Sequence, residues 1–426
     1  MIKIYKYGEI PSEEIFARVS PMANVEDSVA SIIEDVRKRG DEALYEYSLK
    51  FDKASLESLE VSKDEMEEAL EKTEPKFLEI LKKAADNIRA FHENQKKTGF
   101  TMYKQGGIVL GQRVSPIEKA GIYVPGGTAA YPSTVLMDAI PAKIAGCKEI
   151  VMVTPPKEDG KVNPDILAAA SVAGVDRIFK VGGAQAIAAL AYGTKSIPRV
   201  DKIVGPGNAY VAEAKKQVFG QVSIDMIAGP SEILVVADGK SDPIAVAADM
   251  LSQAEHDKMA SAVLVTDSME LAKAVSEEIE RQLSLLEREE IARASVENNG
   301  KIIVAGSIND AVDIANEIAP EHLELCVDDP FGLLERVRHA GSVFLGRNCP
   351  EAIGDYYAGP NHTLPTGGTA RFSSPLSVDD FAKKTQFIYY PEEALDEASE
   401  DVAFFARKEG LTGHAKSALI RGEEKK

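Results

Sequence analysis

The chain has 426 residues, of which 44% are hydrophobic and 27% charged, so it is long enough for about two to four folded domains and too apolar for a wholly disordered protein. Lysine and arginine together number 49 and aspartate and glutamate 68, and the resulting net charge of −19 argues against binding to nucleic acid. No apolar stretch approaches the roughly 18 residues of a membrane-spanning helix, and the opening residues MIKIYKYGEI do not read as a secretory leader. Three scattered cysteines, Cys147, Cys326 and Cys349, are too few for a disulfide framework or a cysteine-based zinc site, so we expect a cytoplasmic protein.

The spacing of apolar residues predicts helices first and an α/β pattern afterwards. Residues 24–49 and 62–97 carry apolar residues at helical intervals between charged ones, as amphipathic surface helices do. From about residue 108, short β-rich runs alternate with Ala-rich helical stretches. Strands are predicted at 121–124, 149–153, 177–181, 202–204, 232–236, 262–266, 301–304, 322–327 and 342–345.

This alternation predicts parallel sheets with helices on both faces. The strands are more numerous than one such sheet needs, so two α/β domains are expected. The boundary is placed near residues 228–232, where Gly229-Pro230 interrupts the rhythm. Residues 377–426 are acidic and are predicted to form a separate helical appendage.

Four of the six histidines lie in segments that suggest chemistry, whereas His92 and His339 are expected to be structural. Gln253 and His256 are three residues apart near the end of a predicted helix, so they share one face. This pair could present two metal ligands, or it could be an ordinary helix C-terminus.

A carboxylate next to an imidazole, Glu321-His322, offers two proton carriers at the start of a predicted strand. The alternative interpretation of this pair is an exposed turn.

Two later segments add further candidates. Residues 347–375 are rich in Gly and Pro, which suggests a binding loop. Within it, Asp355 could bind a metal and His362 could contact a substrate. The alternative interpretation is a plain surface connection. In Glu409–His414, Gly410 can end one helix and His414 can lie in the first turn of the next. The start of a helix disfavours a positive charge, so the imidazole there would stay neutral and could bind a metal. The alternative interpretation is a capped surface turn. Nitrogen and oxygen ligands compatible with Zn²⁺ are thus offered by Gln253, His256, Asp355 and His414.

Three glycine turns follow predicted strands, at Gly121–Gly127, Gly182–Gln185 and Gly205–Asn208. Because ligands bind at the carboxyl edge of α/β sheets, we expect at least one of these turns to line a pocket. The dinucleotide fingerprint is incomplete, since Tyr210 replaces its third glycine, although Asp225 lies at the distance of a ribose contact. Neither Ser231 nor Cys349 has the neighbours that a catalytic nucleophile needs.

The segments together resemble the histidinol dehydrogenase family over residues 105–426. The most specific match runs from Ile224 to His256. Further similar segments occur in the same order: GIYVPGG, STVLM, GGAQAIAAL, GPGNAYV, APEHLEL, GPNHTLPTGGTARFSSPLSV and EGLTGH.

This resemblance implies a zinc enzyme that oxidises L-histidinol through L-histidinal to L-histidine with two NAD, at the end of histidine biosynthesis. Zinc would be held by Gln253, His256, Asp355 and His414. Glu321 and His322 would carry the proton chemistry, with His322 as general base and Glu321 activating water for the second oxidation. Ser231, His362 and Glu409 would contact substrate, together with His322 and the metal ligands. Tyr123, Gln185 and Asn208 would line the NAD site.

The resemblance also implies an architecture. The chain would form a homodimer with intertwined tails, so that Glu409 and His414 serve the partner's site. Two incomplete Rossmann-like domains without the usual glycine fingerprint would be present. The implied bounds are 1–20 for an N-terminal segment, 21–122 with 232–376 for the first α/β domain, 123–231 for the second on the NAD side, and 377–426 for the swapped tail.

Two other functions are open on the residues alone. A zinc hydrolase could use Glu321 or Glu255 as the base for a metal-bound water, but it would not need the three glycine turns. A non-catalytic α/β protein that binds a small amine would keep the pocket but would not need the Glu321-His322 pair.

Overall fold

The computed structural model describes residues 1–9, 11, 15, 25–126 and 130–423. The chain divides into two compact units, Met1–Gln95 with Ile117–Phe381 and Lys96–Pro116 with Ala382–Lys426, and each is described by itself. Gly127 of the first predicted glycine turn and most of the predicted N-terminal segment after residue 9 lie outside the described residues.

The first unit contains a five-stranded parallel sheet in the order β6-β5-β4-β7-β8. Its strands are β4 (Lys119–Tyr123), β5 (Glu149–Thr154), β6 (Arg177–Lys180), β7 (Lys202–Val204) and β8 (Ser223–Ile224). Its helices are α6 (Pro132–Ala145), α7 (Pro164–Ala173), α8 (Gly183–Tyr192) and α9 (Ala209–Val218). Alternate strand residues enter two separate apolar cores, Met152 on one face and Val153 on the other, so both faces are covered as a parallel sheet requires.

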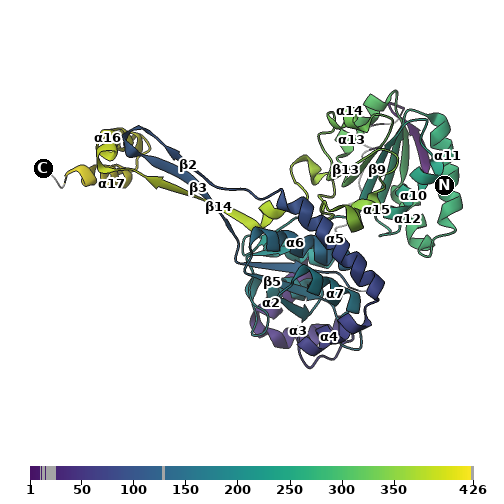
Figure 1. The fold of residues 1–426 in the computed structure, drawn as a ribbon, viewed down its shortest axis with the longest axis horizontal. Coiled ribbons are helices and arrows are strands. Elements are labelled where there is room, and N and C mark those ends of the chain that lie inside the picture. The colour runs from purple at the N-terminus through teal and green to yellow at the C-terminus, as the bar shows by residue number, and fades with distance from the viewer. Residues whose placement is uncertain (10, 12–14, 16–24, 127–129, 424–426) are drawn as a thin grey trace. The chain divides into compact units, whose positions relative to one another are not determined.

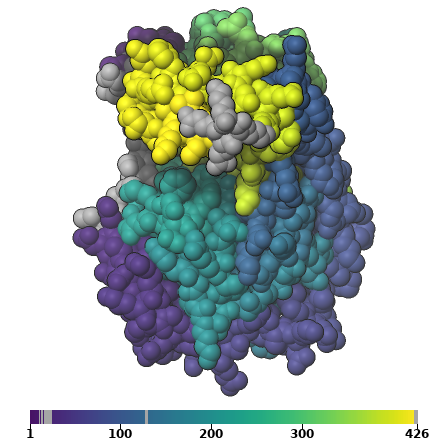
Figure 2. All heavy atoms as spheres, turned by 90° about the vertical axis from the view of Figure 1, so that its left-hand side faces the viewer, coloured from purple at the N-terminus to yellow at the C-terminus, as the bar shows by residue number. Residues whose placement is uncertain are grey.

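The N-terminal helices pack on this five-stranded sheet and its helices (Figure 1). They are α2 (Glu26–Arg39), α3 (Asp41–Phe51), α4 (Lys63–Lys72) and α5 (Pro75–Glu93). Val29 and Val36 of α2 join the core with α8 and α9, and Leu81 and Ile88 of α5 join the core on the opposite face of the sheet. In Figure 2 the purple N-terminal residues accordingly lie against teal residues from the middle of the chain.

The apolar faces of these helices are buried on the 119–224 sheet, whereas the predicted bounds group them with residues 232–376. Each of the two predicted helices is split in two. Gly40, with φ 58° and ψ −128°, separates α2 from α3, and Pro75 begins a new helix after α4 because proline cannot continue one.

A six-stranded parallel sheet in the order β1-β11-β10-β9-β12-β13 forms the other half of the first unit. Its strands are β1 (Lys3–Lys6), β9 (Glu232–Ala237), β10 (Ser261–Thr266), β11 (Lys301–Val304), β12 (His322–Cys326) and β13 (Ser342–Leu345). One face is covered by α10 (Pro243–Ala254), α11 (Met269–Leu283) and α12 (Glu289–Asn299), and the other by α13 (Ile308–Ile318) and α14 (Pro330–Leu334). The predicted α/β class is confirmed, and every predicted strand is present, while β1 and β8 of the two parallel sheets were not predicted, nor were the strands of the second unit.

The middle of the segment 347–375 is buried, with Asn361 4%, Thr363 6% and Thr366 5% exposed, so the interpretation as a plain surface connection is wrong. It contains α15 (Glu351–Ile353), the π-helical turn η2 (Gly354–Ala358) and η3 (Thr369–Arg371), and η4 (Val378–Phe381) follows it. Asn361 Nδ2 donates to the Met137 carbonyl at 2.6 Å, and the Thr363 hydroxyl donates to Asp138 Oδ1 at 3.0 Å. These bonds fasten the segment to α6, a helix of the five-stranded sheet.

The second unit is an antiparallel three-stranded sheet followed by two helices. The strands β2 (Phe100–Tyr103), β3 (Val109–Pro116) and β14 (Ala382–Tyr389) pair in the order β14-β3-β2, with η1 (Gln105–Gly107) between β2 and β3. The helices are α16 (Glu392–Lys408) and α17 (Thr412–Glu423). The tail predicted to be helical, residues 377–426, therefore contains a strand, β14, whose partner β3 lies far away in sequence. Among the described residues, no helix is long and apolar enough to cross a membrane.

Candidate active site

Glu321 and His322 lie at the amino edge of the six-stranded sheet. Helix α13 ends at Ile318, and the left-handed conformation of the next residue, Ala319 (φ 51°), turns the chain into Pro320 and β12. Glu321 is 7% exposed and His322 3%, so the interpretation as an exposed turn is wrong.

One residue of β9, Glu232, orients both side chains. The backbone N–H of Glu232 donates to Glu321 Oε2 at 2.9 Å, and its carbonyl lies 2.9 Å from His322 Nδ1. The carbonyl can only accept, so Nδ1 carries a proton and Nε2 is the nitrogen left for chemistry. Nε2 is buried and has no hydrogen-bond partner among the described residues.

Burial and neighbouring charges shift the pKa values of this pair. Burial raises the pKa of Glu321 to about 7, against the opposing effects of the His322 charge and the Glu232 N–H. Burial alone would lower the pKa of His322, but the carboxyl groups of Glu321, Asp355 and Glu351 outweigh it and raise that pKa to about 10. A carboxyl group that titrates near neutrality can accept a proton and release it again.

Asp355, on η2, lies between two imidazoles. Its Oδ1 is 3.7 Å from His322 Nε2 and 3.9 Å from His362 Nδ1. Burial opposes ionisation of Asp355, but the two histidines hold its pKa well below the usual range, so it remains a carboxylate. Burial lowers the pKa of His362, whose Nε2 lies 3.4 Å from Thr134 Oγ1 on α6.

The end of α10 contributes Gln253 and His256. Asp242 caps the start of this helix by accepting from the Ile244 N–H, and Gln253, in its last turn, is 1% exposed. Burial lowers the pKa of His256, the charge of Asp355 opposes this effect, and the charge of His322 adds to it.

The donor set fits a divalent cation. Gln253 Oε1 and Nε2, His322 Nε2 and Glu351 Oε1 are buried, and among the described residues none has a hydrogen-bond partner. Such groups are costly to bury unless something binds them. A carboxylate, an imidazole and an amide oxygen are ligands that Zn²⁺ accepts.

Glu351 was not predicted as part of the site. Its carboxylate lies with His322 and Asp355 in a group whose ligand atoms are all within 4.8 Å of one another, and its Oε1 is 4.0 Å from His322 Nε2. Its position four residues before Asp355, about one helical turn, was the only signal in the sequence.

The remaining predicted substrate and metal residues lie elsewhere. Ser231 immediately precedes β9 and is half-buried. Glu409 and His414 belong to the second unit and are exposed there, separated by Gly410, whose φ of 77° ends α16. Their roles remain predictions.

The predicted cofactor residues lie at the carboxyl edge of the five-stranded sheet. The Tyr123 hydroxyl accepts from the Gly183 N–H at 3.1 Å, and Gln185, 2% exposed, lies in the first turn of α8. Asn208 caps α9 by accepting from the Tyr210 and Val211 N–H groups. The described glycine turns therefore meet at one edge, where α/β sheets bind ligands.

Asp225 is not available for the predicted ribose contact. Its carboxylate accepts from the Gly205 N–H at 2.8 Å and pairs with Lys215, and both side chains are at most 2% exposed. The Lys215 ammonium group also donates to the Gly205 carbonyl at 3.0 Å. Gly205 itself is required, since a Cβ there would lie 2.1 Å from the Tyr123 carbonyl oxygen. The ion pair thus fixes the shape of this turn.

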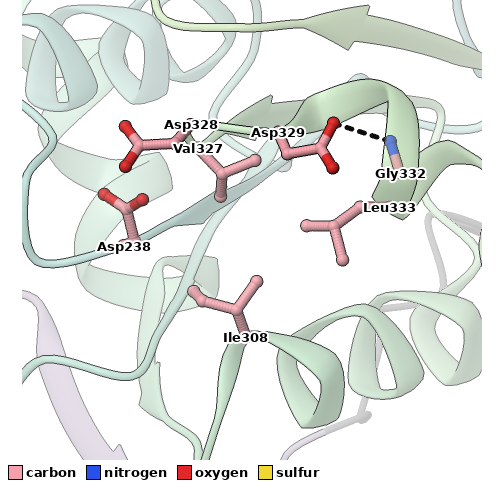
Figure 3. A pocket seen from close by; sticks show the side chains of 7 residues that line it. All are labelled: Asp238, Ile308, Val327, Asp328, Asp329, Gly332 and Leu333. Carbon is pink, nitrogen blue, oxygen red and sulfur yellow. Dashed lines mark hydrogen bonds between the residues drawn. The ribbon is translucent and has the colours of Figure 1, made fainter.

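A hollow of about 400 Å³ lies at the carboxyl edge of the six-stranded sheet, the edge opposite His322 (Figure 3). Ile308, Val327 and Leu333 face it. Its carboxylates already have partners: Arg347 binds both Asp238 and Asp328, and Asp329 caps α14. The unpartnered buried atoms of Gln253, His322 and Glu351 do not line this hollow.

Comparison with known proteins agrees with this geometry. The family model described as histidinol dehydrogenase matches residues 17–422. A histidinol dehydrogenase from Syntrophotalea carbinolica is 56% identical over 404 residues, 94% of each chain, and one from Clostridium acetobutylicum is 53% identical over 99% of each chain. A crystal structure of histidinol dehydrogenase from Elizabethkingia anophelis superposes with a TM-score of 0.94 at 38% identity, covering 99% of this chain and 98% of that one.

Proposed function

This chain belongs to the histidinol dehydrogenase family, and we propose that it oxidises L-histidinol through L-histidinal to L-histidine with two NAD in succession. Family membership makes it an oxidoreductase that acts on a CH–OH group and favours this reaction over a zinc hydrolase or a passive amine-binding protein. The observation that supports the full reaction is the buried Glu321-His322 pair, two proton carriers held by opposite ends of one residue, Glu232.

Zinc is the metal that the donor set supports. Gln253, His256 and Asp355 would hold it, with His414 from the second unit as the fourth ligand. When bound, zinc would orient the amine and imidazole of histidinol, and NAD would accept one hydride in each oxidation.

His322 performs the proton transfer of the first oxidation. The Glu232 carbonyl keeps one proton on Nδ1. A cation held by Asp355 would offset the carboxylate charge that raises the pKa of His322, so that Nε2 would be free to take the hydroxyl proton as the carbon loses its hydride. Asp355, close to Nε2, stabilises the imidazolium that results.

Glu321 prepares the second oxidation. An aldehyde must add water before a second hydride can leave, and the added water must give up a proton. The Glu232 N–H holds Glu321 Oε2, and a pKa of about 7 lets Glu321 take that proton near neutral pH. His322 then accepts the hydroxyl proton of the hydrate as the acid forms. The burial of both groups limits escape of the aldehyde to water.

The NAD site is proposed at the glycine turns, with Tyr123, Gln185 and Asn208 lining it. All three lie at the carboxyl edge of the five-stranded sheet, and α6 connects this sheet to the loop that carries His362. Ser231, His362 and Glu409 are proposed to contact the substrate.

We further propose a homodimer in which the second unit serves the partner's site through Glu409 and His414. The second unit buries the small side chains of Ala403, Ala406 and Ala415 but leaves large ones outside: Ile388 is 73% exposed, Phe404 61% and Phe405 67%. Apolar surface of this kind is typical of an interface. The proposed setting is the cytoplasm, where reducing conditions keep the three free cysteines as thiols.

The decisive experiment measures the yield of NADH from limiting L-histidinol in excess NAD. About two NADH per histidinol are expected for two successive hydride transfers. His322→Asn, which keeps the size of the side chain but not its base, is expected to give almost none. A wild-type protein that releases no NADH from histidinol would refute the proposed function.

A further inference from the structure

A second buried carboxyl cluster lies beside the site, and the reaction described above does not use it. Asp249 on α10 and Glu324 and Cys326 on β12 have side-chain ligand atoms within 4.8 Å of one another. Glu324 is 1% exposed. Two carboxyl groups this close and this buried need a physical reason.

Glu324 supports the helix that precedes Asp355. It lies two residues after His322, so both side chains leave β12 on the same face. Glu324 Oε1 accepts from the backbone N–H of Glu351 at 2.8 Å. That N–H is in the first turn of α15, where no carbonyl of the helix can reach it, and Pro350 at the N-cap has no side-chain acceptor. Glu324 therefore takes the place of a capping residue.

Asp249 joins the same carboxyl group to α10. The side chains of Asp249 and Glu324 are hydrogen-bonded to each other, and burial together with the Asp249 charge raises the pKa of Glu324 to about 9. Glu324 therefore carries the proton and donates it to Asp249. Ser252, also on α10, adds a parallel link by donating its hydroxyl to Glu351 Oε2 at 3.0 Å.

The cluster is better suited to structural support than to a second metal ion. Burial raises the pKa of the Cys326 thiol far above its usual range, and a thiol that keeps its proton is a poor metal ligand. Glu324 is already bound by Asp249 and by the Glu351 N–H, in contrast to the unpartnered atoms of Gln253.

The three elements that this pair joins carry the proposed metal site. Helix α10 carries Gln253 and leads into His256, β12 begins with His322, and α15 leads directly into Asp355. A carboxyl pair between α10 and β12 that also caps α15 fixes the spacing of all three elements.

We infer that Asp249 and Glu324 are positioning residues, a carboxyl clamp that keeps the ligands on α10 and η2 at the spacing one divalent cation requires. The inference rests on the proposed zinc site. Supporting residues of this kind commonly contribute about 10–100-fold to metal affinity.

The test measures the Zn²⁺ dissociation constant of the purified full chain by competition with a chelator of known affinity, independently of activity. Glu324→Leu removes both hydrogen bonds and is expected to weaken zinc binding about 10–100-fold. Glu324→Gln keeps an oxygen for the Glu351 N–H and an amide donor for Asp249, so it is expected to stay within about threefold of wild type. Asp249→Leu should resemble Glu324→Leu, and the double variant should lose much less than the sum, because both remove one interaction.

A matched control separates positioning from general destabilisation. Leu325→Ala lies on the same strand but on its opposite face, in the core formed with α13. It should lower the free energy of unfolding by about 2–5 kcal/mol while leaving the zinc affinity of the folded protein unchanged. Equal losses of affinity in Leu325→Ala and Glu324→Leu would overturn the clamp, as would a loss in Glu324→Gln as large as that in Glu324→Leu.

Failure of the zinc site itself gives a different result. If wild type binds no zinc, or if Gln253→Ala binds it equally tightly, the proposed ligand set is wrong and the clamp falls with it. If Gln253→Ala loses zinc while folded Asp249→Leu and Glu324→Leu bind it like wild type, the clamp alone is overturned. Should Glu324→Leu not fold, Asp249→Leu, at a less buried position, decides the question.

Discussion

Replacing Glu321 with glutamine should separate the two oxidations. The glutamine carbonyl oxygen can still accept the Glu232 N–H that now binds Oε2 at 2.9 Å, so the local structure is expected to persist. The amide cannot take a proton from water, and loss of a positioned general base costs about 10²–10⁴-fold in rate, which corresponds to about 3–5 kcal/mol of barrier. The second oxidation should slow by this amount.

The first oxidation should be much less affected, because His322 Nε2 and its orienting bond from Nδ1 remain. The loss of the Glu321 charge is expected to lower the pKa of His322, since that charge helps to raise it. A change within about tenfold is therefore expected for the first step.

Rapid-mixing measurements with NAD should show this difference directly. With limiting histidinol, the variant should release about one NADH quickly and the second only slowly, whereas wild type releases about two. Histidinal supplied as the substrate should be oxidised slowly by Glu321→Gln and normally by Glu255→Gln, the variant of the other carboxylate considered as a base. Equal slowing of both half-reactions in Glu321→Gln would refute the assigned roles.

Three further outcomes are expected. Burial raises the pKa of Asp138, so folding of the wild type must take up a proton, which costs more free energy as pH rises. Asp138→Asn avoids this cost and should therefore gain stability relative to wild type by up to about 1.4 kcal/mol per pH unit. A pH-independent difference in the free energy of unfolding would contradict this. Lys215→Met should lower the free energy of unfolding by about 3–5 kcal/mol, because it leaves Asp225 buried without its partner. Adding Asp225→Asn should restore much of this stability. A decrease below about 1 kcal/mol in denaturant unfolding would argue against a stabilising ion pair. Inactive His256→Ala and His414→Ala proteins should regain activity when co-assembled, and persistent inactivity of verified mixed dimers would exclude sharing of the tails.

Local sequence patterns determined the α/β class. Most of the predicted strands are short apolar runs whose alternate residues enter cores on opposite faces of their sheet, and this pattern depends only on neighbouring residues. β8, with two residues, is too short for such a pattern, and β1 gains its place only by pairing with β11. Propensity also missed β14, because antiparallel pairing with the distant β3 stabilises it as a strand.

The candidate site divides in the same way. The chemistry of Glu321-His322 and the spacing of Gln253 and His256 can be read in the chain, because they depend on residue type and on adjacent positions. Other features of the site depend on how β9, β12, α10 and α15 pack. Packing provides the buried environment that raises the pKa of Glu321 to about 7 and the carbonyl that sets the His322 tautomer. It also brings the carboxyl groups of Glu351, Glu324 and Asp249 to the site. Sequence determines which groups can exchange protons or bind a cation, whereas their desolvation and mutual distances depend on contacts between segments far apart in the chain, which only the tertiary structure decides.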